Sequence, residues 1–134
     1  MPKFKSVMLI DDEHIINFIN QKVIESINIT ERIESFTSAM HALDHYKLNH
    51  KNEEYCNQYM PQLILLDLAM PHMDGFEFLD AFDKLHYFKQ QPIDIVMLSS
   101  SDNPADIEKA TNHKNCFAYI IKPLTIGKLL KHLQ

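Results

Sequence analysis

Short apolar runs alternate with longer amphipathic stretches along this chain of 134 residues. Five of the runs have the length of a strand, and they cover residues 4–10, 32–36, 63–66, 93–98 and 117–121. Runs that are apolar almost throughout are typical of strands covered on both faces, as in a parallel sheet. Because amphipathic stretches separate them, the pattern predicts an α/β fold of the (βα)5 type, with a doubly wound, parallel five-stranded sheet.

Helices are expected in the stretches between and after the strands, at residues 14–27, 38–48, 75–85, 104–113 and 126–133. Side chains that can cap a helix precede three of them: Thr37 or Ser38, Asn103 and Thr125. The polar segment 49–60 is either an extension of the second helix or a surface loop.

Apolar residues recur at helical spacing in the first helix, which predicts that they face the core: Ile15, Ile16, Ile19, Val23, Ile24 and Ile27. In the second helix, we expect Met40, Leu43 and Tyr46 to be buried.

Composition narrows the class of protein. With 46% hydrophobic and 23% charged residues, the chain has the balance of an ordinary globular domain, which we expect to extend over residues 1–134. No apolar run approaches the roughly 20 residues that span a bilayer, and the N-terminus leads into a strand rather than a signal peptide, so we expect a cytoplasmic protein with no membrane partner. The net charge of −5 argues against direct binding of nucleic acid. Cys56 and Cys116 belong to no recognised motif and are expected to be free thiols.

Charged residues follow three of the predicted strands. Asp11 and Asp12 follow the first strand, Asp67 follows the third and Lys122 follows the fifth. In a doubly wound sheet the carboxyl ends of strands one and three are neighbours at the topological switch point, so the three carboxylates are expected to meet. Clustered carboxylates usually hold a proton or bind a hard cation, and a set of oxygen ligands suits Mg²⁺. The pattern therefore predicts a magnesium site.

Each of these residues also has a simpler explanation when it is taken alone. Asp11 and Asp12 could cap the first helix, where carboxylates are favourable. Asp67 could be a turn residue at the end of a strand, and Lys122 could be a solvated surface lysine. Only their combination points to a site.

Five motifs at the strand ends together resemble the receiver domains of two-component response regulators, the single-domain chemotaxis-type regulators among them. They are, in chain order, Leu9-Ile10-Asp11-Asp12-Glu13, Leu66-Asp67-Leu68-Ala69-Met70-Pro71, Asp74-Gly75, Met97-Leu98-Ser99-Ser100 and Tyr119-Ile120-Ile121-Lys122-Pro123. Each motif is common alone, whereas all five in this order are highly specific. The resemblance covers almost the whole chain, and it implies a flavodoxin-like sheet with strand order 2-1-3-4-5.

The resemblance also implies roles in phosphoryl transfer. Asp67 matches the phosphoacceptor, whose carboxylate attacks a phosphohistidine. Lys122 would pair with Asp67 and then with the phosphoryl group, and Ser99 would hydrogen-bond a phosphoryl oxygen. Tyr119 matches an aromatic switch position that turns inward when Ser99 moves, although it could simply be packed in the sheet. The bond from Lys122 to Pro123 matches a cis position.

For the metal, the resemblance implies that Asp12 and Asp67 are direct ligands of Mg²⁺. Asp11 would help directly or through water, and the backbone carbonyl of Ala69 would be a further ligand. Ala69 and Ser101 occupy positions that tune the lifetime of the phosphate in this family. Neither carries an acid or amide that could orient a hydrolytic water, so we predict a persistent phosphoryl group.

We therefore expect a stand-alone regulator that is phosphorylated by a histidine kinase or a histidine phosphotransfer protein and is not a turnover enzyme. It would signal to a downstream protein through the face formed by residues 104–113, 117–121 and 126–133, as a monomer or as a weak, phosphorylation-dependent dimer. The alternatives are a receiver fragment of a longer regulator and an interaction module that is not phosphorylated. A phosphatase of small substrates is a third, disfavoured because the chain has only two glycines and no phosphate-binding glycine-rich loop.

Overall fold

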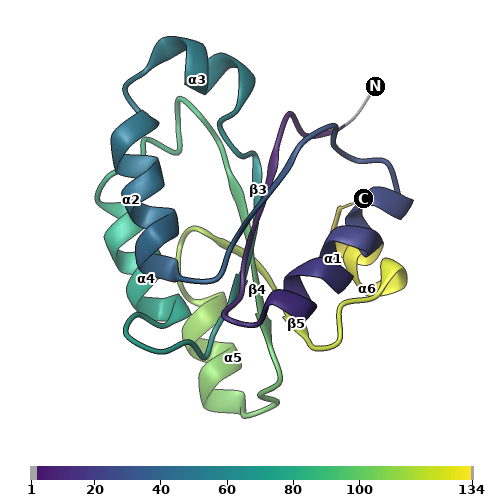
Figure 1. Cartoon of the computed structure of the whole chain (residues 1–134). Helices are drawn as coiled ribbons and strands as arrows, with labels where there is room; N and C mark the ends of the chain where they lie inside the picture. Colours follow the sequence, from purple (N-terminus) through teal and green to yellow (C-terminus); the bar gives the residue numbers. More distant parts are fainter. Residues whose placement is uncertain (1–2, 134) are drawn as a thin grey trace.

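The computed structural model describes residues 3–133, in which one parallel sheet carries helices on both faces (Figure 1). The strands lie in the order β2-β1-β3-β4-β5, which confirms the predicted topology. Their bounds are β1 (Val7–Ile10), β2 (Ile33–Phe36), β3 (Leu63–Asp67), β4 (Asp94–Ser99) and β5 (Cys116–Ile121). The helices are α1 (His14–Ser26), α2 (Ala39–Asn49), α3 (Glu53–Gln58), α4 (Gly75–Asp83), α5 (Pro104–Thr111) and α6 (Ile126–Leu133). Residues 1, 2 and 134, which the predicted domain of residues 1–134 includes, lie outside the described residues.

Two hydrophobic clusters enclose the sheet, one on each face. Alternate side chains of β1 belong to different clusters: Met8 and Ile10 pack toward α2 and α4, whereas Val7 and Leu9 pack toward α1 and α6. Figure 1 shows the same division, with α2, α4 and α5 on one side of the sheet and α1 and α6 on the other. Because both faces of the central strands are buried, successive residues of each strand must be apolar, which explains the uninterrupted runs in the sequence.

The buried face of α1 differs from the predicted one. Ile24 is fully buried, but Ile15 and Ile19 are 67% and 47% exposed, so the prediction was wrong for these two residues. Asn17 and Asn20 are buried instead. The amide of Asn17 donates hydrogen bonds to the ends of β1 and β2, and a buried polar group is tolerated when it is hydrogen-bonded in this way. The helix therefore turns a polar stripe toward the sheet edge and leaves apolar side chains outside.

The segment 49–60 forms neither of the two predicted structures. It contains a separate short helix, α3, which begins after Asn52, whose side chain accepts a hydrogen bond from the backbone N–H of Tyr55. Tyr55 is buried and joins the cluster that contains Leu43 and Tyr46 of α2, both buried as predicted. Met40 is 47% exposed, contrary to the prediction. The cap at Asn52 and the burial of Tyr55 explain why a separate helix forms here.

The remaining predictions for local structure agree with the fold. Ser38, Asn103 and Thr125 each accept a hydrogen bond from a backbone N–H in the first turn of the helix that follows. Cys56 and Cys116 are both free. Within residues 3–133, no helix has the length and apolar character required to cross a bilayer.

Candidate functional site

The carboxyl ends of β1 and β3 bring three acids together. Ile10 is paired with Leu66 in the sheet, so the residues that follow them leave adjacent strands side by side. Carboxylate oxygens of the three acids lie within 4.8 Å of one another, in the cluster of Asp11, Asp12 and Asp67. The first and third of these are buried, and Asp12 is exposed. The predicted meeting of the carboxylates at the switch point is therefore confirmed.

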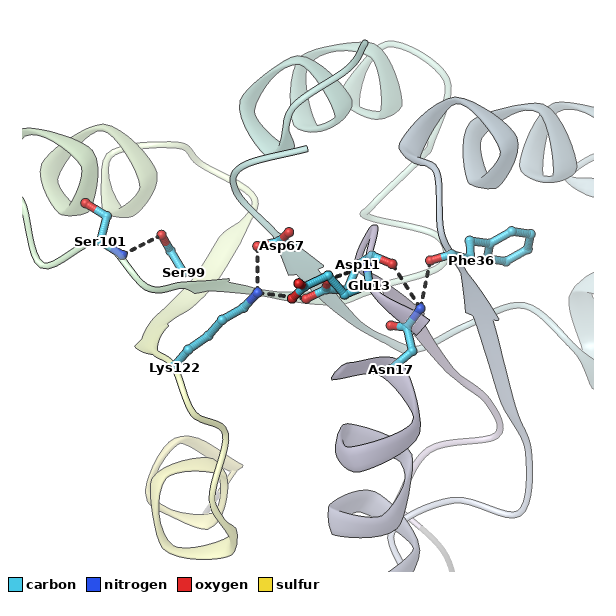
Figure 2. Close-up of polar contacts among 8 residues, drawn as sticks. All are labelled: Asp11, Glu13, Asn17, Phe36, Asp67, Ser99, Ser101 and Lys122. Carbon is cyan, nitrogen blue, oxygen red and sulfur yellow. Dashed lines mark hydrogen bonds and ion pairs between the residues drawn. The ribbon is translucent and has the colours of Figure 1, made fainter. Parts of the chain in front are cut away.

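Lys122 reaches the cluster from the end of β5. Its ammonium nitrogen lies 2.8 Å from Oδ2 of Asp11 and 3.0 Å from Oδ1 of Asp67 (Figure 2). Its backbone N–H donates to the carbonyl of Ser99, which ties the end of β5 to the end of β4. The bond between Lys122 and Pro123 is cis, as the family resemblance implies.

The environment of Asp67 favours its neutral form. Only 5% of the residue is exposed, and this burial raises the pKa of its carboxyl to about 6. The hydrogen bond from Lys122 acts in the opposite direction, and the negative charge of Asp11 raises the pKa further. For Lys122, burial alone would lower the pKa, but the hydrogen bonds to Asp11 and Asp67 outweigh it, so its pKa is raised and the side chain stays charged.

Ser99 and Tyr119 are linked through the loop that follows β4. Ser99 is 3% exposed, and its hydroxyl oxygen accepts the backbone N–H of Ser101 at 3.0 Å. The hydroxyl of Tyr119, a half-buried residue of β5, donates to the carbonyl of Ser101 at 2.8 Å. Ser101 in turn donates its own hydroxyl to Asp106 on α5. The loop therefore connects a hydroxyl beside the acidic cluster with the outer part of β5 and with α5.

The turn after Asp67 is shaped by a close approach of α4. Ala69, whose carbonyl was predicted as a metal ligand, is exposed in this turn. Gly75 begins α4 and donates its N–H to the carbonyl of Leu68 at 2.8 Å. A Cβ atom at Gly75 would lie 2.7 Å from the carbonyl oxygen of Asp67, a distance that side-chain carbons do not tolerate. Glycine therefore lets the helix pack directly against the backbone of the central aspartate.

The residues present are suited to Mg²⁺. The ligand atoms that the cluster offers are carboxylate oxygens, which hard cations prefer. Both oxygens of Asp11 already have protein partners, because Oδ1 accepts the N–H of Glu13 and Oδ2 accepts Lys122. Asp12 is exposed, and Asp67 has one oxygen that accepts no hydrogen bond from the described residues. The arrangement fits Asp12 and Asp67 as direct ligands better than Asp11.

Sequence reasoning overlooked the buried asparagine beneath this site. Asn17 touches the ends of two strands, and its Oδ1 has no hydrogen-bond partner within the described residues. The only signal in the sequence is that Asn17 stands among the apolar residues of an amphipathic helix. A polar side chain that is buried on such a helix needs hydrogen-bond partners, and the strand ends provide them.

Comparison with known proteins gives one consistent family. A family model described as the response regulator receiver domain matches residues 7–134. The probable methanogenesis regulatory protein FilR2 of Methanothrix harundinacea is 29% identical over 96% of this chain and 78% of its own length. The response regulator Rcp1 of Synechocystis is 28% identical over 97% of this chain and 84% of its own length.

Solved structures agree with the sequence relatives. A two-component response regulator from Cytophaga hutchinsonii superposes with a TM-score of 0.83 at 31% identity, covering 96% of this chain and 92% of its own. A response regulator receiver protein from Dyadobacter fermentans gives a TM-score of 0.77 at 29% identity, covering 96% of this chain and 93% of its own.

Proposed function

Because the chain belongs to the family of response regulator receiver domains of two-component systems, we propose that Asp67 is its phosphoacceptor. The donor is a histidine kinase or a histidine phosphotransfer protein, and the transfer takes place in the cytoplasm. The observation that carries this proposal is the setting of Asp67: a buried carboxylate with one oxygen held by Lys122 and two further acids beside it.

The proposed reaction is a displacement at phosphorus. One carboxylate oxygen of Asp67 remains free to bind the cation. The other forms a bond to the phosphorus of the donor phosphohistidine, while the bond from phosphorus to the imidazole nitrogen breaks. The imidazole leaves with the electron pair of that bond and takes up a proton. Such transfers depend mainly on positioning and charge neutralisation, and the rigid attachment of Asp67 to the central strand provides the first of these.

Charge neutralisation is the second requirement, because a phosphoryl group adds about two negative charges to a site that already holds three acids. We assign Mg²⁺ binding to Asp12, Asp67 and the carbonyl of Ala69, with Asp11 acting through water. The bound cation would supply positive charge to the phosphoryl oxygens. Lys122 supplies the remaining positive charge from a position where its ammonium already contacts Asp67.

We propose that the phosphorylated state is read through Ser99. Its hydroxyl oxygen accepts the N–H of Ser101, so turning Ser99 toward a phosphoryl oxygen breaks this bond and releases the loop. The same loop holds the hydroxyl of Tyr119, which would then be free to change its partner. A local change at Asp67 is in this way converted into a shift between two arrangements of the loop.

The proposed output surface is the face formed by α5, β5 and α6. Three large apolar side chains are exposed on β5 and α6, namely Phe117, Ile121 and Ile126. Tyr119 lies among them in sequence and contacts the switching loop. A downstream protein, or a second copy of the chain in a weak phosphorylation-dependent dimer, would bind here.

The exposed apolar side chains of α1 suggest where the phosphodonor binds. Ile15, Phe18 and Ile19 are 47–67% exposed, and they lie in the helix that follows Asp12 directly. An apolar surface beside the acidic cluster would hold a donor protein while its phosphohistidine reaches Asp67. Phe18→Ser should therefore slow transfer from the cognate phosphohistidine protein without affecting phosphorylation by acetyl phosphate. Leu48→Ser, at an exposed position on α2, is the matched control and should affect neither.

The primary test is incubation with acetyl phosphate and Mg²⁺, followed by intact mass spectrometry. We expect one phosphoryl adduct in the native protein, none when the cation is removed by EDTA, and none in Asp67→Asn. An adduct that survives Asp67→Asn would refute the proposal. The absence of an adduct in the native protein would instead favour an interaction module that is not phosphorylated.

We propose no turnover of external substrates. After transfer the phosphoryl group stays on the protein until water removes it, so each chain accepts one group per cycle. Hydrolysis of a small phosphate ester that persists in Asp67→Asn would contradict this view and would point to a phosphatase.

A further inference from the structure

We propose that Asn17 is a positioning residue for cation binding: it fixes the end of β1 in the place from which Asp12 reaches the cation. This inference rests on the proposed function of the acidic cluster, and it assigns a role to a residue outside that cluster. Asn17 lies in the first turns of α1 and is 3% exposed.

The side-chain amide of Asn17 joins two strand ends. Its Nδ2 donates to the carbonyl of Asp11 at 3.1 Å and to the carbonyl of Phe36 at 3.1 Å. Figure 2 shows the amide nitrogen between these two carbonyls, with the amide oxygen turned away from them. The backbone of Asn17 is also held in place, because its N–H donates a hydrogen bond to the carbonyl of Glu13 at 3.2 Å. One residue thus connects the beginning of α1 with the ends of β1 and β2.

These bonds complete the restraint of Asp11. Its backbone N–H donates to Phe36, its Oδ1 accepts the N–H of Glu13, and its Oδ2 accepts Lys122. The bond from Asn17 holds the one remaining polar atom of Asp11, the backbone carbonyl. Since that carbonyl belongs to the peptide unit that leads into Asp12, its orientation sets the direction in which Asp12 leaves the strand.

A purely structural role does not account well for this asparagine. Its Oδ1 is buried and has no hydrogen-bond partner within residues 3–133. An unpaired buried acceptor is unfavourable, and it offsets part of the stability that the two donated bonds provide. A leucine of similar shape would avoid this penalty, although it would release the carbonyl of Asp11. Stability alone therefore gives little preference for asparagine at this position, whereas positioning of the Asp11 carbonyl requires a donor.

The test compares Asn17→Leu with Asn20→Leu. Asn20 is a second buried asparagine on the same helix, and its side chain forms no hydrogen bond with the described residues. The dissociation constant for Mg²⁺ is measured by titrating the metal-free proteins and following backbone amide shifts in ¹H–¹⁵N NMR spectra. Thermal unfolding of the same samples is the second readout. Asn17→Ala serves as a replacement if the leucine variant does not fold.

We expect Asn17→Leu to weaken Mg²⁺ binding roughly tenfold, as is typical when a residue that orients a metal ligand is removed. Its melting temperature should stay close to that of the native protein, because one unpaired buried acceptor, Oδ1 of Asn17, is exchanged for another, the carbonyl of Asp11. Phosphorylation by acetyl phosphate should be slower at low Mg²⁺ concentration and normal at saturation. Asn20→Leu should bind Mg²⁺ as the native protein does. A dissociation constant for Asn17→Leu within twofold of the native value, or equal weakening in both variants, would overturn the inference.

The two proposals fail in different ways. If the native protein binds Mg²⁺ and Asn17→Leu weakens that binding, but no phosphoryl adduct forms, the phosphoacceptor proposal fails and the positioning role stands. If the adduct forms and the two variants bind Mg²⁺ like the native protein, only the positioning role fails. A native protein that binds no Mg²⁺ contradicts the positioning role directly.

Discussion

The ammonium nitrogen of Lys122 lies 3.0 Å from Oδ1 of Asp67, and the same ammonium also holds Asp11. One positive charge therefore serves a cluster of three acids, so the site carries an excess of negative charge. Burial is the main reason why the pKa of Asp67 is raised despite the contact with lysine, and the negative charges of Asp11 and Asp12 add to the shift. From the excess of negative charge we expect that a cation must bind before a phosphoryl group can be added. The raised pKa also means that the ionised form of Asp67 lowers the stability of the fold.

The first prediction concerns the stability of Asp67→Asn. The pKa of Asp67 is raised from 3.8 to about 6 in the folded chain, so ionisation of this carboxyl favours unfolding. The penalty is absent below about pH 4, grows between pH 4 and pH 6, and is complete above that range. Without Mg²⁺ at pH 7.5, Asp67→Asn should raise the free energy of unfolding by about 1–3 kcal/mol.

Urea denaturation followed by circular dichroism, at pH 7.5 and at pH 4, measures this effect. The gain should disappear at the lower pH, where Asp67 is protonated. Asp12→Asn removes an exposed acid of the same cluster and should give a smaller gain. An equal gain for Asp67→Asn at both pH values would show that ionisation is not its cause.

The second prediction uses the two glycines of the chain as a matched pair. A Cβ at Gly75 would collide with the backbone of Asp67, whereas nothing lies within 4 Å of a Cβ at Gly127. Gly75→Ala should lower the free energy of unfolding by about 1–3 kcal/mol, because the backbone at Asp67 or at the start of α4 would have to move to make room for the Cβ atom. Gly127→Ala, in α6, should raise it by about 0.5–1 kcal/mol. Chemical denaturation ranks the variants, and a Gly75→Ala protein as stable as the native one would refute the close approach.

The third prediction concerns a buried hydrogen-bonded pair on the side of the sheet covered by α2 and α4. The hydroxyl of Tyr46 lies 2.6 Å from Nδ1 of His86, and Nε2 of His86 lies 2.5 Å from the carbonyl of Gln91. Tyr46→Phe leaves the buried Nδ1 of His86 without a hydrogen-bond partner. It should lower the free energy of unfolding by about 1–2 kcal/mol. Tyr87→Phe changes an exposed tyrosine nearby in sequence and should change stability by less than about 0.5 kcal/mol.

The pair of Tyr46 and His86 also predicts that the stability of the fold depends on pH. Burial lowers the pKa of His86 below 6.5; the hydrogen bond to Gln91 opposes this shift, and the charge of His50 adds to it. Because the unfolded chain binds the proton more tightly, the contribution of His86 to stability is complete above about pH 6.5 and decreases as the pH falls below that value. NMR titration of the ring should give a midpoint below 6.5. A midpoint above 6.5 would contradict the burial of the neutral ring.

The fourth prediction concerns the lifetime of the phosphoryl group. Ala69 has no polar side chain, and the hydroxyl of Ser101 is already engaged with Asp106, so neither residue orients a water toward the phosphoryl group. Decay followed by intact mass spectrometry should be slow in the native protein. Ala69→Glu, which places a carboxylate beside the site, should accelerate it several-fold, and Ala69→Ser should not. Equal decay rates in all three proteins would show that residue 69 does not determine the lifetime of the phosphoryl group.

Much of the site could be predicted because it depends on strand ends. The apolar runs that end before Asp11 and Asp67 define two buried strands, and the rule for doubly wound sheets places these strands side by side. The contact of Lys122 with Asp67 was inferred from the family resemblance, since no local pattern fixes which way a lysine at a strand end points. Its contact with Asp11 was not predicted.

The face of a helix was less predictable than the ends of strands. Ile15 and Ile19 have the spacing of core residues, yet they are exposed because Asn17 takes the position that faces the strand ends. Hydrophobicity alone cannot reveal this, since the burial of Asn17 depends on carbonyl groups that only the folded sheet brings near. The short helix α3 was missed for a different reason. Its capping residue, Asn52, can be recognised in the sequence, but Tyr55, the residue that it buries, is a single residue in a polar segment.

The most direct test of the central claim is to locate the phosphoryl group on the chain. Protein treated with acetyl phosphate and Mg²⁺ is reduced with borohydride, which converts an aspartyl phosphate to homoserine, and the peptides are sequenced by tandem mass spectrometry. We predict homoserine at position 67 alone, and none when EDTA replaces Mg²⁺. Homoserine at Asp11 or Asp12 with an unchanged Asp67, or a phosphoryl group on a histidine, would contradict the account.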